Sequence, residues 1–210
     1  MQRFLSVLTI RARGYIILFI DSTATSRESV REMCNLQKKK LVIVMNGKGG
    51  VGKDALCDAL TVAYRVKNVS AITPIKEIAS RYGWNGEKDE KGRRFLAELK
   101  RVFVEYNDLP NKYLLDEYRA FLESDDDVLC VHIREKEEIA KFVAGVDTPC
   151  VTVLVRRTAI DGGQAYGNDA DDKVGEYTYD WEFSNDLPLE ESGEAFRTLI
   201  AHVIDGFYAE

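Results

Sequence analysis

The sequence predicts an α/β protein with a mostly parallel, five-stranded sheet flanked by helices. Short continuous apolar runs of strand length alternate along the chain with longer segments whose apolar residues recur at helical spacing. With 210 residues, 45% of them hydrophobic, the chain can bury one sizeable core, and it contains no internal repeat or low-complexity linker. These observations favour one main domain with insertions over two domains.

The first predicted strand, at residues 41–45, is an apolar run that we expect to be buried on both faces, as in a parallel sheet. A glycine-rich turn follows, and then a helix with apolar residues at positions 55, 56, 59, 60 and 63. A second short strand is predicted at residues 69–72. Pro74 then marks the start of a helix that runs through Ala79.

A polar, loop-like stretch at residues 83–92 precedes an amphipathic helix that begins at Arg93 and ends before Pro110. Its predicted apolar stripe consists of Phe95, Leu99, Val102, Phe103 and Tyr106. The remaining predicted elements are a helix at 113–122, a strand at 128–133, a helix at 135–142, a strand at 151–155, a long polar loop from 156 to about 176, a strand at 181–183 and a closing helix at 195–207.

The composition excludes some function classes. Charged residues of both signs make up 30% of the chain and the net charge is -6, which argues against a bulk nucleic-acid or anionic-membrane binder. The longest clean apolar run near the N-terminus, residues 15–20, is far shorter than the roughly 20 residues that a membrane span needs. The four cysteines form no C-x-x-C pair, so we expect reduced thiols and a cytoplasmic protein.

Residues 1–40 are expected to be an N-terminal extension outside the domain that begins at residue 41. Three interpretations of it stay open. The first is a poorly ordered extension, or the product of a start codon assigned too far upstream. The second is an extra strand or helix packed on the domain. The third is a targeting segment. Arg3, Arg11 and Arg13 interrupt its apolar patches, so a signal-peptide core would be short.

A glycine-rich segment between the first strand and its helix carries the strongest functional signal. Gly47, Gly52 and Lys53 meet the spacing G-x-x-x-x-G-K of a phosphate-binding loop. Glycines allow the backbone to aim its N–H groups at phosphate oxygens, and the lysine reaches the β and γ phosphates. The motif predicts a three-layer P-loop NTPase fold that binds ATP. The predicted nucleotide-binding residues are Gly47, Lys48, Gly49, Gly50, Val51, Gly52, Lys53, Asp54 and Ala55.

Position 54 departs from the usual motif, in which a Ser or Thr after the lysine binds Mg²⁺. A carboxylate beside a triphosphate is repelled unless a cation bridges the two or a basic side chain pairs with it. Asp54 is therefore the predicted metal-binding residue. The alternatives are that it has left the metal shell or that it caps the helix.

The Gly-Lys-Asp ending of the loop resembles two groups of P-loop kinases, the bacteriophage-type deoxynucleoside monophosphate kinases and the animal phosphomevalonate kinases. Residues 72–79, 88–96 and 131–135 resemble further segments of the phage-type family in the same order, with Thr73 and His132 in place of its usual aspartates. Residues 183–187 are similar to a late strand and Asn-Asp turn of several nucleotide and dephospho-coenzyme-A kinases. The similarity runs from about residue 41 to the C-terminus.

The resemblance implies a kinase that uses ATP and Mg²⁺ and phosphorylates a nucleotide or another small molecule that carries a phosphate group. Lys53 would stabilise the transferring charge, and Arg93 or Arg94 together with Arg134 would hold the acceptor phosphate. The acceptor would bind an insertion at about 80–122.

The same resemblance places Arg156 and Arg157 at the mouth of a lid that spans about 156–178. Independent support for a lid comes from the length of this segment and from its glycines at 162, 163 and 167, which are candidate hinges.

Asp54 and His132 together remove both of the usual protein anchors for Mg²⁺. Three alternatives follow. Asp54 itself holds the Mg²⁺, Glu135 or the acidic run 125–127 helps to hold it, or catalysis is weak or absent. Two other functions therefore stay open. Lys48 is similar to the extra lysine of partitioning and division-site ATPases, which predicts an ATP-dependent dimerising switch. The third possibility is a non-catalytic nucleotide-binding protein.

Overall fold

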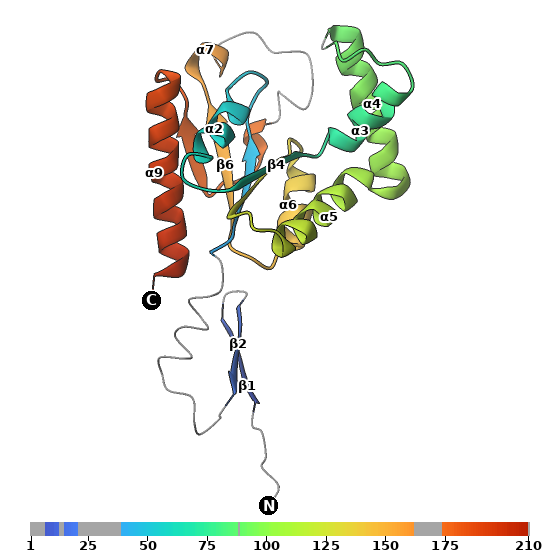
Figure 1. Cartoon of the computed structure of the whole chain (residues 1–210). Coiled ribbons are helices and arrows are strands. Elements are labelled where there is room, and N and C mark those ends of the chain that lie inside the picture. Colours follow the sequence, from blue (N-terminus) through green and yellow to red (C-terminus); the bar gives the residue numbers. More distant parts are fainter. Residues whose placement is uncertain (1–6, 13–14, 21–38, 88, 162–173, 210) are drawn as a thin grey trace, which may run out of the picture. The chain divides into compact units, whose positions relative to one another are not determined.

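The computed structural model describes residues 7–12, 15–20, 39–87, 89–161 and 174–209, and it divides into two compact units, Met1–Lys39 and Lys40–Glu210 (Figure 1). In the first unit, β1 (Val7–Ala12) pairs antiparallel with β2 (Tyr15–Ile20), with Val7 opposite Ile20. Residues 1–6, 13–14 and 21–38 lie outside the described part of the chain.

The second unit contains a five-stranded sheet in which each neighbouring pair is parallel. This confirms the predicted α/β class. The order across the sheet is β4-β5-β3-β6-β7, so the first strand of the unit is central. The strands are β3 (Leu41–Asn46), β4 (Val66–Ser70), β5 (Val128–His132), β6 (Cys150–Arg156) and β7 (Trp181–Ser184).

Helices cover both faces of the sheet and produce three layers (Figure 1). On one face, Ile43 of β3 packs with α2 (Lys53–Leu60) and α9 (Leu189–Tyr208). On the other face, Val42 and Val44 pack with α5 (Leu109–Glu123) and α6 (Lys136–Ala144). Every residue of β3 is buried, as an apolar run between two helical layers requires.

Two further helices form what we call the arm: α3 (Thr73–Arg81) and α4 (Glu90–Asn107). Its own small core is centred on Ile75, Ala79 and Leu96, with Leu99 and Phe103 partly buried against it. The predicted apolar stripe of α4 is therefore only partly correct. Its other three members, Phe95, Val102 and Tyr106, are exposed because the helix turns the face that includes Leu96 toward α3.

Two other predictions need correction. The second strand is β4, Val66–Ser70, and not residues 69–72. It is the edge strand of the sheet and Val69 is its only buried residue, so its apolar pattern is weak. The predicted long loop contains the short helix α7 (Thr158–Asp161) and the 3-10 turn η1 (Val174–Glu176). Residues 162–173, with the three candidate hinge glycines, lie outside the described part of the chain.

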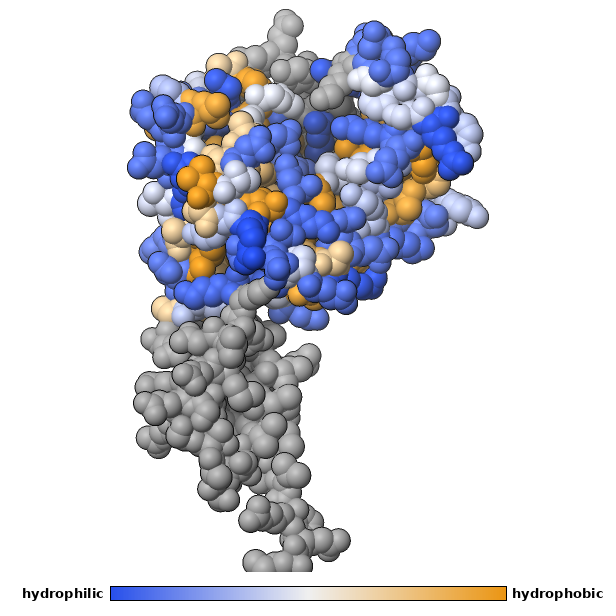
Figure 2. All heavy atoms as spheres, viewed as in Figure 1, coloured by the Kyte–Doolittle hydropathy of each residue, from blue (hydrophilic) through white to orange (hydrophobic). Residues whose placement is uncertain are grey.

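The viewed face of the second unit is mostly hydrophilic, with apolar side chains in separate small patches (Figure 2). Among the described residues, none of the helices is long and apolar enough to cross a membrane. Cys57, Cys130 and Cys150 form no disulfide.

Candidate functional site

The glycine-rich segment that the sequence predicts to bind phosphate, residues 47–53, lies between the carboxyl end of β3 and the start of α2; we call it the cradle. β3 has β5 on one side and β6 on the other; the connection that leaves β3 passes through α2 on one face of the sheet, and the connection that leaves β5 passes through α6 on the other face. In open parallel sheets, ligands bind at this kind of topological switch point, outside the carboxyl ends of the strands. The fold thus places the cradle where a ligand is expected.

Backbone geometry explains why the cradle is rich in glycine. Gly47, Gly50 and Gly52 have φ angles of 142°, 86° and 92°, a region that side chains disfavour. A Cβ atom on Gly47 would lie 2.4 Å from the backbone oxygen of Val155, and one on Gly52 would lie 2.4 Å from Nδ2 of Asn185. The glycines therefore allow both the turn itself and its close approach to neighbouring strands.

Lys53 is bonded within the cradle. Its Nζ donates to the carbonyl oxygens of Gly47 at 2.6 Å and Lys48 at 3.0 Å. The lysine thus curls over the loop whose N–H groups would receive phosphate oxygens. It begins α2, so an anion held here would also meet the positive end of the helix dipole.

Asn46, the last residue of β3, connects the cradle to two other segments. Its Oδ1 accepts from the N–H of Gly47 at 2.7 Å, while its Nδ2 donates to the backbone oxygen of Arg134 at 2.8 Å and to the hydroxyl of Tyr179 at 2.7 Å. Asn46 is buried, so these bonds satisfy an amide that would otherwise be costly to bury. Asn46 was not among the predicted site residues, although an Asn between an apolar strand and the first glycine is a visible signal.

Asn185 supports the cradle from the other side. Its Nδ2 donates to the backbone oxygen of Val51 at 2.7 Å, and its own N–H donates to the backbone oxygen of Arg156 at 2.8 Å. Asp186, the next residue, accepts from the N–H and hydroxyl of Thr158 at the start of α7. The Asn-Asp turn therefore joins the cradle, the end of β6 and the first turn of the predicted lid.

The predicted arginines fall into two groups. Arg134 follows β5, and its guanidinium NH2 lies 4.0 Å from the position of a Cβ on Gly49, so the structure brings it to the cradle. Arg156 and Arg157 lie at the carboxyl end of β6, and Nε of Arg156 pairs with Glu182 at 3.0 Å.

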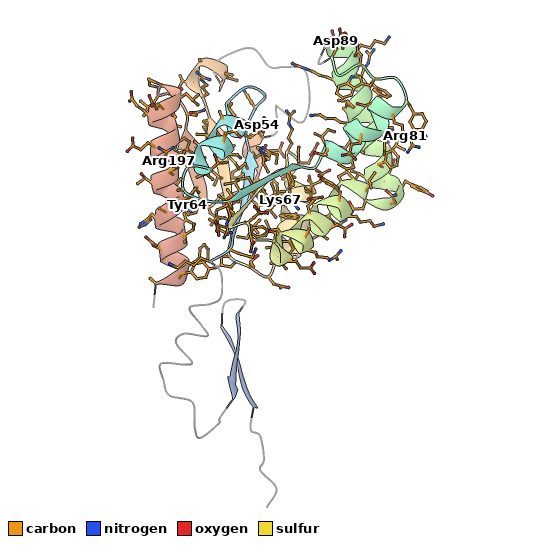
Figure 3. The ribbon with its side chains drawn as sticks, viewed as in Figure 1. Asp54, Tyr64, Lys67, Arg81, Asp89 and Arg197 are labelled. Atoms are coloured by element: carbon orange, nitrogen blue, oxygen red, sulfur yellow. The ribbon has the colours of Figure 1, made fainter. Side chains whose placement is uncertain are left out.

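Arg93 and Arg94 form the second group, in the first turn of α4, where both are exposed. In the described part of the chain, neither side chain is hydrogen-bonded or ion-paired to the cradle. Figure 3 shows the separation: Asp89, which caps α4, and Arg81 lie on the arm, away from Asp54 on α2.

Lys100, on α4, makes a polar contact with the start of α6, the helix that follows Arg134. Its Nζ lies 2.5 Å from Glu135 and 2.8 Å from Glu138, and only 12% of its side chain is exposed. Burial, helped by the charge of Glu135 and opposed by Lys100, raises the pKa of Glu138 to about 7. Although burial opposes it, Lys100 holds the pKa of Glu135 below its usual value. The sequence offered no signal for this triad.

Asp54 lies in the first turn of α2 with 87% of its side chain exposed, and its Oδ1 is 3.6 Å from Nε2 of His132. Mg²⁺ prefers oxygen ligands in an octahedral arrangement. Asp54 fits that preference as one carboxylate ligand, whereas His132, at the carboxyl end of β5, offers a nitrogen. The side chains at the usual metal position thus fit Mg²⁺ through Asp54 alone.

His132 is hydrogen-bonded: its Nε2 lies 2.7 Å from Oδ1 of Asn68. The sulfur of Cys57 lies 3.7 Å from the same nitrogen. A hydrogen bond with Cys130 and burial raise the pKa of the Cys57 thiol, which therefore remains protonated.

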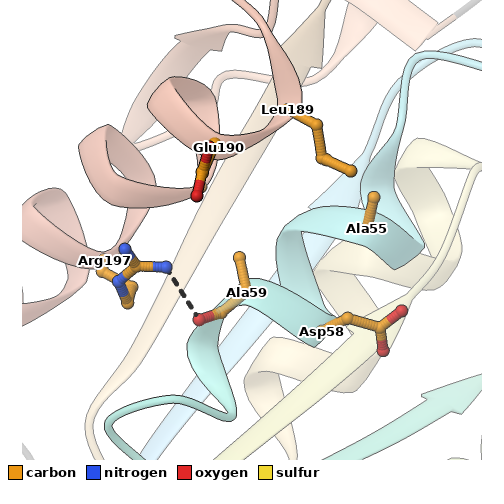
Figure 4. Close-up of a pocket in the computed structure, with 7 residues that line it drawn as sticks. Ala55, Asp58, Ala59, Leu189, Glu190 and Arg197 are labelled. Carbon is orange, nitrogen blue, oxygen red and sulfur yellow. Dashed lines mark hydrogen bonds between the residues drawn. The ribbon is translucent and has the colours of Figure 1, made fainter.

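A cavity of about 260 Å³ opens between α2 and α9, and Figure 4 shows the N–H of Arg197 donating to the backbone oxygen of Ala59 across it. Ala55 lines this cavity, so its side chain faces α9. The full lining consists of Ala55, Asp58, Ala59, Leu189, Glu190, Gly193 and Arg197.

Comparison with protein-family models and with curated protein sequences gives no match. Among solved structures, the chain is similar to a shikimate kinase from Aquifex aeolicus, with a TM-score of 0.45 and 14% identity over 80% of this chain and 99% of that one. It is also similar to a tunicamycin resistance protein from Deinococcus radiodurans, with a TM-score of 0.49 and 13% identity over 77% and 95% of the two chains. A gluconokinase from Sinorhizobium meliloti gives a TM-score of 0.45 and 12% identity over 82% and 97%.

Proposed function

We propose that this protein transfers a phosphoryl group from ATP to a small, nucleotide-like acceptor such as a nucleoside or deoxynucleoside monophosphate. One observation carries the proposal: the guanidinium of Arg134 lies beside the cradle, which also holds Lys53. Two cations beside one predicted phosphate-binding turn, Lys53 at the start of α2 and Arg134 just beyond the end of β5, would provide charge for both a donor and an acceptor phosphate.

Phosphoryl transfer demands little covalent participation from a protein, because positioning and charge stabilisation supply most of the catalysis. Lys53 would exchange its bonds to the carbonyl oxygens of Gly47 and Lys48 for the donor's phosphate oxygens. Arg134 would orient the acceptor phosphate from the end of β5. A divalent cation, Mg²⁺ in the kinases that the sequence resembles, would be held by Asp54 and neutralise charge on the donor phosphates.

The other predicted arginines belong to two segments that we propose move during the reaction, the lid and the arm. Arg156 and Arg157 would close a lid at 156–178 over the donor phosphates and exclude water. Arg93 and Arg94 would reach the acceptor only if the arm moves toward the cradle. The Lys100 contact to Glu135 and Glu138 then lies at the junction across which that motion takes place.

The proposal is tested by measuring ADP release with each nucleoside and deoxynucleoside monophosphate as acceptor. We expect turnover with at least one acceptor and a loss of about a thousandfold or more in Lys53→Ala. Arg134→Ala should raise KM for the acceptor more than KM for ATP. Glu194→Ala, an exposed change on α9 outside the predicted acceptor-binding insertion, serves as the control.

Two results would contradict the proposal. Tight ATP binding without turnover on any acceptor would favour a non-catalytic nucleotide-binding protein. A basal ATPase that rises with ATP-dependent dimerisation and collapses in Lys48→Ala would favour the switch.

A further inference from the structure

His132 and Asp54 stand on two elements that meet beside the cradle. His132 ends β5, the neighbour of β3, and Asp54 directly follows Lys53 on α2. Their facing atoms, Nε2 and Oδ1, are 3.6 Å apart. The histidine ring is held in place by Asn68, whose Oδ1 lies 2.7 Å from Nε2, and only 11% of the histidine side chain is exposed.

The separation of these atoms fits a shared metal ion. Imidazole nitrogens and carboxylate oxygens bind divalent transition ions at about 2.0–2.2 Å, so one ion can touch two such atoms that lie roughly 3–4 Å apart. The identity of the atoms selects the ion. Imidazole nitrogen suits zinc, copper, iron and nickel ions, whereas Mg²⁺ favours an all-oxygen shell.

We propose that Asp54 and His132 together bind a first-row divalent transition ion at the cradle, and that the nucleotide is bound as its complex with that ion in preference to Mg²⁺. This inference rests on the proposed nucleotide binding and deepens it by naming the class of ion. When the ion binds Nε2 of His132, it replaces the hydrogen bond between that nitrogen and Oδ1 of Asn68.

The pair is an incomplete site by itself. Across the described residues, no group of three or more histidine, cysteine, aspartate or glutamate side chains has the arrangement to hold a metal. Phosphate oxygens of the nucleotide therefore supply the remaining ligands. Ion and nucleotide must then bind cooperatively, each raising the affinity for the other by the same factor.

Pulsed electron paramagnetic resonance of Mn²⁺ tests the inference directly. The full chain, uniformly labelled with ¹⁵N, is mixed with Mn²⁺ and an unlabelled, non-hydrolysable ATP analogue, so that a protein nitrogen is distinguished from the adenine nitrogens. We expect a ¹⁵N coupling that disappears in His132→Asp. The chain has only two histidines, and His202→Asp, an exposed change on α9, is the matched control in which the coupling should persist.

A competition experiment gives a second readout. We expect the analogue to bind about tenfold more tightly with Zn²⁺ than with Mg²⁺, because imidazole nitrogen suits Zn²⁺ whereas Mg²⁺ favours oxygen ligands. The double variant Asp54→Ser, His132→Asp restores an all-oxygen pair and should remove the preference. Thermal melting of each variant checks that it is folded.

Bound Mn²⁺–nucleotide without ¹⁵N coupling would overturn the inference, as would a coupling that survives in His132→Asp. Nucleotide binding that depends on Lys53 but is equally tight with both ions would leave the proposed function standing and refute the metal preference. A chain that binds no nucleotide under either condition would overturn both.

Discussion

The cradle and the arm both follow carboxyl ends of strands in the same sheet, but different forces hold them. The cradle follows β3, which is buried on both faces, and buried amides of Asn46 and Asn185 fix it through hydrogen bonds. The arm follows the edge strand β4 and is held by a small core around Ile75 and by the Lys100 contact. The segment proposed to bind phosphates thus follows a strand that is buried on both faces, while the region proposed to move follows the edge strand.

Gly47→Ala should have the largest effect, because its Cβ would meet the backbone oxygen of Val155 at 2.4 Å in the adjacent strand β6. We expect a loss of about 3–4 kcal/mol in the free energy of unfolding and loss of nucleotide binding. Gly86→Ala is the matched control, because Gly86 also has a positive φ, of 89°, but its Cβ would meet nothing within 4 Å. Chemical denaturation should show a cost of about 1 kcal/mol there. Equal costs at the two positions would refute the steric explanation.

Ile75→Ala should loosen the arm and leave the cradle intact. Ile75 is fully buried in the arm's own core, so the truncation should lower the free energy of local unfolding of the arm by about 2–3 kcal/mol. Hydrogen exchange should accelerate in α4 and remain slow in β3. Leu56→Ala, a fully buried change beneath the cradle, is the comparison and should accelerate exchange in both regions. Uniform acceleration in Ile75→Ala would show that the arm is not an independent unit.

The junction between arm and sheet should depend on pH. The pKa of Glu138 is raised to about 7 in the folded chain, above its unfolded value, so the stability from this group is present below about pH 4.5 and lost as the pH rises through 7. As the pH rises from 5 to 8, the free energy of unfolding of the Glu138→Gln variant should therefore fall by about 1–2 kcal/mol less than that of the native chain. Denaturant titrations at both values measure this. Glu137→Gln, an exposed neighbour, should track the native chain.

The smallest effect is expected on the outer face of α4. Tyr106 is 81% exposed, so Tyr106→Ser should change the free energy of unfolding by no more than about 0.5 kcal/mol. Phe103→Ser, in the same helix but packed against the arm's core, should cost clearly more. A large effect of Tyr106→Ser would mean that this face is covered in solution.

The contrast between the buried strand β3 and the edge strand β4 also explains which elements could be predicted from the sequence. β3, the cradle and α2 were predicted because a buried apolar run and the glycine spacing are local patterns. β4 was misplaced because Val69 is its only buried residue, so its periodicity is weak.

Contacts between distant residues were not predictable. Asn46 meets Tyr179 across 133 positions, and Lys100 meets Glu135 across 35. Because no spacing rule connects such pairs in a single sequence, the site's polar supports became visible only in the structure. The position of Arg134 beside Gly49 depends on the sheet order in the same way.

The bonds from Lys53 to the carbonyl oxygens of Gly47 and Lys48 also have a consequence in time. If the cradle binds a nucleotide as proposed, the ammonium group must leave these oxygens before the phosphates can bind there. Association then proceeds in two steps, and stopped-flow traces should show an observed rate that levels off at high nucleotide concentration. The observed rate at the plateau would measure how fast the ammonium group of Lys53 leaves the two carbonyl oxygens.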